Sequence, residues 1–399
     1  MFALARALLK HGHEVHVAAS PNFATWAGQL GLPFTTIGCD TQAWLAANPK
    51  CMTGDPLRMM RGMRRFFGDE LPAQFDGLID AAQGSSAIVC AGLALAAPSV
   101  GEHLGIPVLG VAYSPCVIPG GDHPPAMVPW QGLPRWVNSL IWWMTHRFSQ
   151  QTFGIPINSG RARLGLAPVG MFDHLCRQLP WLVAADCTIL PPSAEWAARV
   201  PYASFLFFDD ERTLDPELEV WLAEGEPPVF VGFGSMSGDA TARIGGVLRQ
   251  ALSLCGHRVL LGAGWAGLGQ GDLPPGWRVV GDVPHARLFE RVGAVIHHGG
   301  SGTMATALRA GVPQVVLPLI LDQYYHADRL HRAGLAPRAG SLERVTADGL
   351  CRALEATLAL DPRRRREAAA RLSTVDGAAL AIGHLERLAA GERILPPFS

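Results

Sequence analysis

Residues 294–323 constrain the fold more than any other part of the 399-residue chain. An apolar run at residues 294–296 predicts a buried strand, and the letters HHGGSGT at residues 297–303 predict a glycine turn that opens directly into a helix. Glycines let the backbone approach a ligand closely, and the first turn of a helix carries unpaired N–H groups and a partial positive charge. This strand, turn and helix therefore suit a phosphate.

A second apolar run, at residues 314–319, ends close to Asp322 and Gln323. Open α/β sheets bind their ligands at the carboxyl ends of the strands, so we expect the polar groups after both runs to converge on one edge. Asp is a favoured N-cap residue, which suits Asp322 to the start of the next helix. A carboxylate beside an amide also suits the hydroxyls of a sugar, and the two roles can coexist.

An earlier predicted strand, residues 229–233, ends in a similar turn that contains Ser235. In a parallel sheet both turns lie at the same edge, and two sets of N–H groups on one edge predict a diphosphate site. Considered alone, His298 is best interpreted as a histidine that is hydrogen-bonded to the backbone at a strand end. The neighbouring glycines and helix start favour a donor to a phosphate oxygen, whereas His297 is interpreted as structural.

The composition excludes several other kinds of protein. A formal net charge of −1 leaves no electrostatic footprint for nucleic acid, and the basic run at residues 363–366 is typical of a solvated helix face. Eight cysteines without a C-x-x-C pair predict reduced thiols with neither a disulfide framework nor a zinc site. Since no apolar run reaches transmembrane length and no signal-peptide layout is present, we expect a cytoplasmic protein whose membrane contact is at most peripheral.

Other phosphate-binding and metal-binding motifs are missing from the sequence. Neither a G-x-G-x-x-G dinucleotide fingerprint after the first strand nor a G-x-x-x-x-G-K-[ST] loop is present. No group of Glu, Asp and His has metal-ligand spacing. The predicted site offers N–H groups and helix ends where a metal would otherwise balance diphosphate charge, so we expect no metal and no cofactor.

The order of predicted elements indicates two α/β domains. Residues 1–207 form the first, an acidic linker covers 208–226, and residues 227–377 form the second. The last helical segment, 378–399, is expected at the junction of the two.

An aromatic stripe lies in the first domain. Trp136, Leu140, Trp143 and Phe148 recur near helical spacing. Such a stripe is more typical of a core than of an apolar acceptor pocket, and both interpretations stay open.

Taken together, these motifs resemble the nucleotide-sugar glycosyltransferases of family 1, whose GT-B fold has two facing Rossmann-like domains. The segments that carry the resemblance are HHGGSGT, AGVPQ, a strand ending in Pro, and DQ, preceded by GFGSM and GDVPHARLF. Within the family the chain is most similar to the bacterial and fungal branch that acts on apolar acceptors, including sterol glucosyltransferases and the rhamnosyltransferase of rhamnolipid synthesis. The resemblance runs from Phe2 to about Gly340 and continues weakly to the end.

The resemblance implies a donor site with three parts. Its diphosphate contacts are Ser235, His298, Gly300, Ser301, Gly302 and Thr303. Asp322 and Gln323 would bind the donor sugar, and the backbone at Val283 would hold the nucleoside base. Two positions depart from the plant-type members: Asp282 replaces a Trp, and Thr306 replaces a Glu that binds the ribose. The resemblance therefore leaves base and ribose recognition open.

The amino-terminal end departs furthest from the family. Relatives begin with a strand and a G-x-x-G-[DH] loop whose Asp or His belongs to the base machinery, whereas this chain opens on the helix that would follow. We therefore expect the first strand of the domain, and the catalytic base, upstream of Met1. His11 and His13 lie at the far end of the predicted helix, so neither is assigned as the base.

The resemblance implies an inverting enzyme that moves a hexose from a UDP- or dTDP-sugar to a hydroxyl of an apolar acceptor of lipid, polyketide, sterol or terpenoid type. One alternative is a truncated or non-catalytic relative that binds nucleotide or helps another enzyme. Another is a sugar-nucleotide epimerase of the same fold, which needs acidic and basic groups in the cleft that the sequence does not identify. The sugar, the base and the acceptor stay open.

Overall fold

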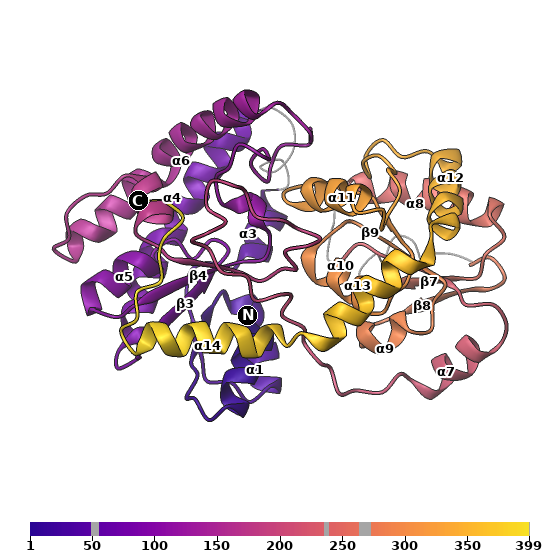
Figure 1. The fold of residues 1–399 in the computed structure, drawn as a ribbon, viewed down its shortest axis with the longest axis horizontal. Helices are drawn as coiled ribbons and strands as arrows, with labels where there is room; N and C mark the ends of the chain where they lie inside the picture. The colour runs from indigo at the N-terminus through magenta and orange to yellow at the C-terminus, as the bar shows by residue number, and fades with distance from the viewer. Residues whose placement is uncertain (49–55, 235–238, 263–272, 399) are drawn as a thin grey trace.

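The computed structural model describes residues 1–48, 56–234, 239–262 and 273–398. They form two α/β halves that lie side by side, joined by extended chain (Figure 1). Every strand pair in these residues is parallel. The predicted α/β class with two domains built on parallel sheets is confirmed.

The second half contains one five-stranded sheet in the order β10-β9-β6-β7-β8. Its strands are β6 (Val229–Gly232), β7 (Val259–Gly262), β8 (Trp277–Val280), β9 (Ala294–His297) and β10 (Gln314–Val316). The helices from this half to the chain end are α7 (Pro216–Ala223), α8 (Asp239–Leu254), α9 (His285–Phe289), α10 (Ser301–Arg309), α11 (Gln323–Arg332), α12 (Ala347–Ala359), α13 (Pro362–Thr374) and α14 (Gly377–Ala389).

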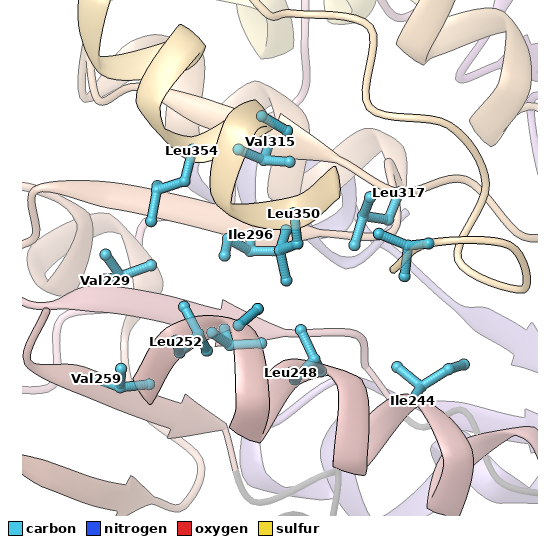
Figure 2. Close-up of a cluster of buried hydrophobic side chains, with 14 of the residues drawn as sticks. Val229, Ile244, Leu248, Leu252, Val259, Ile296, Val315, Leu317, Leu350 and Leu354 are labelled. Carbon is cyan, nitrogen blue, oxygen red and sulfur yellow. The ribbon is translucent and has the colours of Figure 1, made fainter. Parts of the chain in front are cut away.

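Helices cover both faces of this sheet, which explains why its strands are apolar without alternation. On one face Val229 and Ile296 pack against Leu248 of α8 and Leu350 of α12 (Figure 2). On the other face Phe230, the residue after Val229, packs in a second cluster with α7, α9 and α10. Both sides of each strand are therefore buried.

The predicted acidic linker is only partly a connection. Residues 208–215 run outside any helix or strand, but α7 follows, with Asp215 accepting from two backbone N–H groups at its first turn. Leu218 and Leu222 of α7 are buried with Phe230. The second half of the predicted linker thus contributes to the core of the second domain.

The first half holds two separate sheets among its described residues, β1-β2 and β3-β4-β5. The strands are β1 (Val17–Ala19), β2 (Phe34–Thr36), β3 (Ile88–Ala91), β4 (Val108–Ala112) and β5 (Trp181–Val183). The helices are α1 (Phe2–Lys10), α2 (Ala24–Gln29), α3 (Thr41–Ala47), α4 (Pro56–Ala82), α5 (Ala97–Leu104) and α6 (Arg135–Arg163). A further strand ahead of Phe2 stays a prediction.

The aromatic stripe of α6 is not core, so the interpretation favoured from the sequence is wrong. Trp136 and Trp143 are 71% and 58% exposed, and Leu140 is exposed as well. The helix packs on α4 through its other side, with Phe153 and Ile157 buried there. Helical spacing marks a face but does not say whether that face points inward, because α6 carries apolar residues on both sides.

The last two helices tie the halves together. Arg371 of α13 forms an ion pair with Asp186 of the first half at 2.9 Å. Helix α14, expected at the junction, packs against α1 of the first half, where Leu385 and Leu4 share a cluster (Figure 1). The carboxyl-terminal end of the chain is therefore built into the amino-terminal half.

A buried apolar cluster spans both halves. It includes Ile118 and Trp196 from the first half and Leu308, Tyr325 and Leu330 from the second. Buried apolar surface of this kind stabilises the arrangement of the halves as well as each half alone.

Candidate donor site

The sheet of the second half has a topological switch point between β6 and β9. From β6 the chain moves outward through β7 to β8 and then returns to place β9 on the other side of β6. Open α/β sheets bind ligands outside the carboxyl ends of strands at such a point. The two predicted glycine turns follow these two strands, and a Cβ added to Gly234 would lie 3.6 Å from Cε1 of His298. Gly234, just after β6, therefore lies beside the His298 ring.

The glycines after β9 are required by geometry. Gly299 has a φ of +91°, and a Cβ there would approach Val316 to 2.8 Å. A Cβ on Gly300 would lie 2.6 Å from Nε2 of His298. The first glycine permits the turn and the second leaves room for the histidine ring.

His297 stabilises this turn through hydrogen bonds of its ring. It is fully buried, its Nδ1 accepts from the N–H of Gly299 at 3.1 Å, and its Nε2 donates to Oε1 of Gln314 at 2.9 Å. An acceptor at Nδ1 and a donor at Nε2 define a neutral ring. Burial lowers the pKa of this imidazole to about 3, which agrees with the structural role inferred from the sequence.

His298 presents an unsatisfied polar atom at the switch point. Its Nδ1 is buried without a hydrogen-bond partner among the described residues. Burial lowers the pKa of the imidazole, the charge of Asp322 partly opposes this, and His326 adds to the lowering. Buried polar groups are rarely left unpaired, so a neutral His298 is positioned for a ligand.

The start of α10 supplies N–H groups beside His298. Gly300 is its N-cap residue, and no side chain caps the helix. A Cβ on Gly302 would meet nothing within 4 Å, so the first turn is open on that side. Ser301 donates its hydroxyl to the backbone oxygen of Tyr113 at 3.3 Å, which leaves its backbone N–H for the cradle and links it to the first half. Thr303 follows in the same turn.

Asp322 and Gln323 lie at the start of α11, after β10. Asp322 is the N-cap residue by position, but its carboxylate makes no cap hydrogen bond. Gln323 is buried, and its Oε1 accepts from the N–H groups of Leu319 and Ile320 at 2.8 and 3.0 Å. Gln323 therefore shapes the turn, and its Nε2 group is the part suited to a ligand.

Three comparisons place this geometry among known proteins. A family model described as "Erythromycin biosynthesis protein CIII-like, C-terminal domain" matches residues 259–379. The glycosyltransferase VinC, solved in complex with dTDP, superposes with a TM-score of 0.67 at 21% identity over 97% of this chain and 95% of its own. The vancomycin aglycone glucosyltransferase of Amycolatopsis orientalis is 35% identical over 395 residues, 96% of this chain and 92% of the relative.

The chain belongs to the family 1 glycosyltransferases. It has the GT-B fold and is an enzyme, a glycosyltransferase. A sterol glucosyltransferase, UGT80B1 of Arabidopsis thaliana, aligns at 28% identity over 425 residues, 100% of this chain and 67% of the relative. The sterol branch expected from the sequence is thus found among the relatives, at lower identity.

The remaining predicted donor residues of the glycosyltransferase lie at the same sheet edge or outside the described residues. Ser235 is among the latter. Val283 follows β8, is half-buried, and packs against the cluster around Phe230. Asp282, where plant-type members carry Trp, is exposed and pairs with Arg212 at 2.8 Å.

One residue of the glycosyltransferase site was missed from the sequence. His326 is fully buried in α11, and its Nδ1 donates to the backbone oxygen of Gly299 at 2.8 Å. Its Nε2 lies 3.9 Å from Oδ2 of Asp322, one helical turn earlier. His326 therefore anchors the glycine turn through Nδ1 and leaves Nε2 without a hydrogen-bond partner among the described residues, beside the predicted sugar-binding carboxylate. The i,i+4 spacing after Asp322 is the signal that would have identified it.

The buried histidines predict acid sensitivity of the folded glycosyltransferase. Burial lowers the pKa of His297 to about 3 and that of His123 to about 4, whereas both return to about 6.5 on unfolding. Between about pH 4 and 6.5 the unfolded chain binds more protons, so the free energy of unfolding falls as the pH falls. We expect a loss of about 2 kcal/mol per histidine at pH 5 relative to pH 7.5.

Thermal unfolding at several pH values measures this loss. The variant His123→Gln should be less stable near neutral pH and should show a shallower decline on acidification. Equal slopes for variant and wild type would contradict the assignment of His123.

Proposed function

We propose that this glycosyltransferase transfers a hexose from a UDP- or dTDP-sugar to a hydroxyl of an apolar acceptor, with inversion at the anomeric carbon. The observation that carries the proposal is the proximity of Gly234 to His298 at the switch point, with the unpaired Nδ1 of His298 between β9 and α10. A diphosphate fits this arrangement because it takes several N–H donors and the positive end of a helix dipole.

In the proposed reaction the acceptor oxygen attacks the anomeric carbon while the bond from that carbon to the diphosphate oxygen breaks. Negative charge develops on the leaving diphosphate, where the N–H groups at the start of α10 and a ring N–H of His298 stabilise it. The acceptor proton passes to a base that we do not assign.

Charge balance supports a metal-independent reaction. The described residues contain no group of three or more His, Cys, Asp or Glu side chains placed to hold a metal ion. The donors at the switch point offer another way to balance the diphosphate charge. Full activity in the presence of EDTA would agree with this proposal, and restoration of lost activity by Mg²⁺ would overturn it.

The dTDP bound to VinC supports a dTDP-sugar, and the vancomycin aglycone and sterol of the two named relatives support a large acceptor with apolar surface. Incubation with UDP- and dTDP-hexoses and a panel of such acceptors tests the proposal. NMR of the product gives the anomeric configuration. Retained configuration, or no product from any pair, would overturn it. A cytoplasmic location stays a prediction.

Asp322→Asn tests the proposed sugar contact separately from the diphosphate contacts. Because its carboxylate makes no cap bond, the substitution should leave α11 intact. We expect kcat/KM for the donor to fall about tenfold to a hundredfold, as for a lost hydrogen bond to a charged group of 1.5 to 3 kcal/mol. Binding of the free nucleoside diphosphate, measured by calorimetry, should not change. Weaker binding of the free diphosphate would place Asp322 at the phosphates instead.

A further inference from the structure

The exposed face of α6 is an apolar surface that the donor site does not use. Trp136, Leu140, Trp143 and Met144 are all exposed, and their spacing of four, seven and eight residues puts them on one side of the helix. Helix α6 lies along the outer side of the first half (Figure 1). Trp130, in the loop that leads into the helix, is exposed as well. Contiguous apolar patches on a protein surface mark interaction sites.

The middle of this face is basic, whereas at the first turn of the helix Arg135 pairs with two carboxylates, those of Asp122 and Glu195. Between Asp122 and Asp173 the chain contains no Asp or Glu. The guanidinium carbon of Arg147, one turn beyond Trp143, lies 5.7 Å from the centre of that indole ring. The apolar face therefore carries its own positive charge although the whole chain has a formal net charge of −1.

Helix α4 carries two exposed arginines about one helical turn beyond the end of this face. It runs parallel to α6, since Phe67 contacts Phe153 at 4.6 Å and Phe75 lies against Gly160. Because Phe67 faces Phe153 and the helices run in the same direction, Arg64 lies level with position 150 of α6. It is exposed, as is the neighbouring Arg65.

We propose that the α6 face, defined by Trp136, Leu140, Trp143, Met144 and Arg147, docks the glycosyltransferase on a bilayer surface with anionic headgroups. Indole rings suit the boundary between headgroups and acyl chains, because one end is apolar and the other carries an N–H group. Arginines beside such a face bind acidic lipids and extend toward the headgroups. None of the described helices is long and apolar enough to cross a bilayer.

A second copy of the chain suits this face less well. In a two-fold dimer the same patch lies on both sides of the interface, which brings like charges near Arg147 together. An acceptor pocket needs concave walls, whereas these side chains project from one face of a single helix. The combination of exposed indoles with the exposed guanidinium of Arg147 favours lipid.

Sedimentation of the full chain with vesicles tests the proposal. Wild type should bind phosphatidylcholine vesicles that contain phosphatidylglycerol, bind pure phosphatidylcholine vesicles more weakly, and dissociate as salt is raised. The affinity of the double variant Trp136→Ser, Trp143→Ser for the vesicles should be lower by a factor of about ten or more. Arg147→Glu should remove the preference for the anionic vesicles.

A matched control lies on the other half of the molecule. Val220 and Leu254 are 60% and 65% exposed. The double variant Val220→Ser, Leu254→Ser therefore removes exposed apolar side chains far from α6, and it should bind vesicles as wild type does. The proposal would be overturned if wild type bound neither kind of vesicle, or if the tryptophan variant bound vesicles as wild type does. It would also be overturned by a tryptophan variant that turns a dimer into a monomer in light scattering, or one that raises KM for a water-soluble acceptor.

Discussion

Replacing His298 with alanine is expected to lower kcat about 10²-fold to 10³-fold, the usual cost of removing one hydrogen-bond donor to developing negative charge. His298 has its Nδ1 unpaired among the described residues and lies beside Gly234, just after β6. Because the ring makes no hydrogen bond that holds the fold, the variant should unfold at the same temperature as wild type. Steady-state kinetics and thermal unfolding measure the two quantities.

His103→Ala is the matched control for this substitution. His103 is exposed near the end of α5 in the first half, so its loss should change neither quantity. Turnover of His298→Ala within a few-fold of wild type would remove the histidine from the mechanism. A large drop in melting temperature would show that its role is structural.

Substitution of Gly302 by alanine should raise KM for the donor about tenfold or more and leave stability unchanged or slightly higher. Within the chain a Cβ at Gly302 meets nothing within 4 Å. Alanine also favours a helix over glycine by about 0.5 to 1 kcal/mol. Only a bound ligand can therefore make the methyl group harmful. Crowding of a tightly packed contact costs roughly 1 to 3 kcal/mol, and each 1.4 kcal/mol is a factor of ten.

Gly246→Ala separates the ligand effect from the helix effect. Gly246 lies in α8, and a Cβ there also meets nothing within 4 Å. Its substitution should raise stability by a similar amount with no effect on donor KM. Gly302→Ala with wild-type KM would show that no phosphate approaches the first turn of α10.

The local parts of the donor site could be predicted from the sequence because they depend on residues close together in the chain. The strand, turn and helix of residues 294–303 follow from an apolar run, two glycines and an Ala-rich segment, and the structure has β9 and α10 there. The contact between Gly234 and His298 could not be derived in this way. It depends on the sheet order, which puts β9 next to β6.

His326 shows a second limit of the sequence. Nothing in the local pattern says that its ring turns back to the carbonyl of Gly299, because that contact needs α11 packed against the turn. The stripe on α6 shows a third. Trp142 is buried, with its Nε1 donating to the carbonyl of His123 at 3.0 Å, while Trp143 is exposed, so packing of the preceding loop decides which of two adjacent tryptophans is covered. The roles of the donor residues stay predictions until a ligand or a variant tests them.

The packing of α14 against α1 makes the first half discontinuous in sequence. Recombination between glycosyltransferases at one crossover point, in the chain between β5 and β6, would join α14 of one parent to α1 of the other. Leu385 and Leu4 share a buried cluster, so such a hybrid would carry a mismatched core. The second half is better exchanged with two crossovers, one ahead of α7 and one between α13 and α14. The ion pair between Arg371 and Asp186 then crosses the new boundary and needs both partners to be kept.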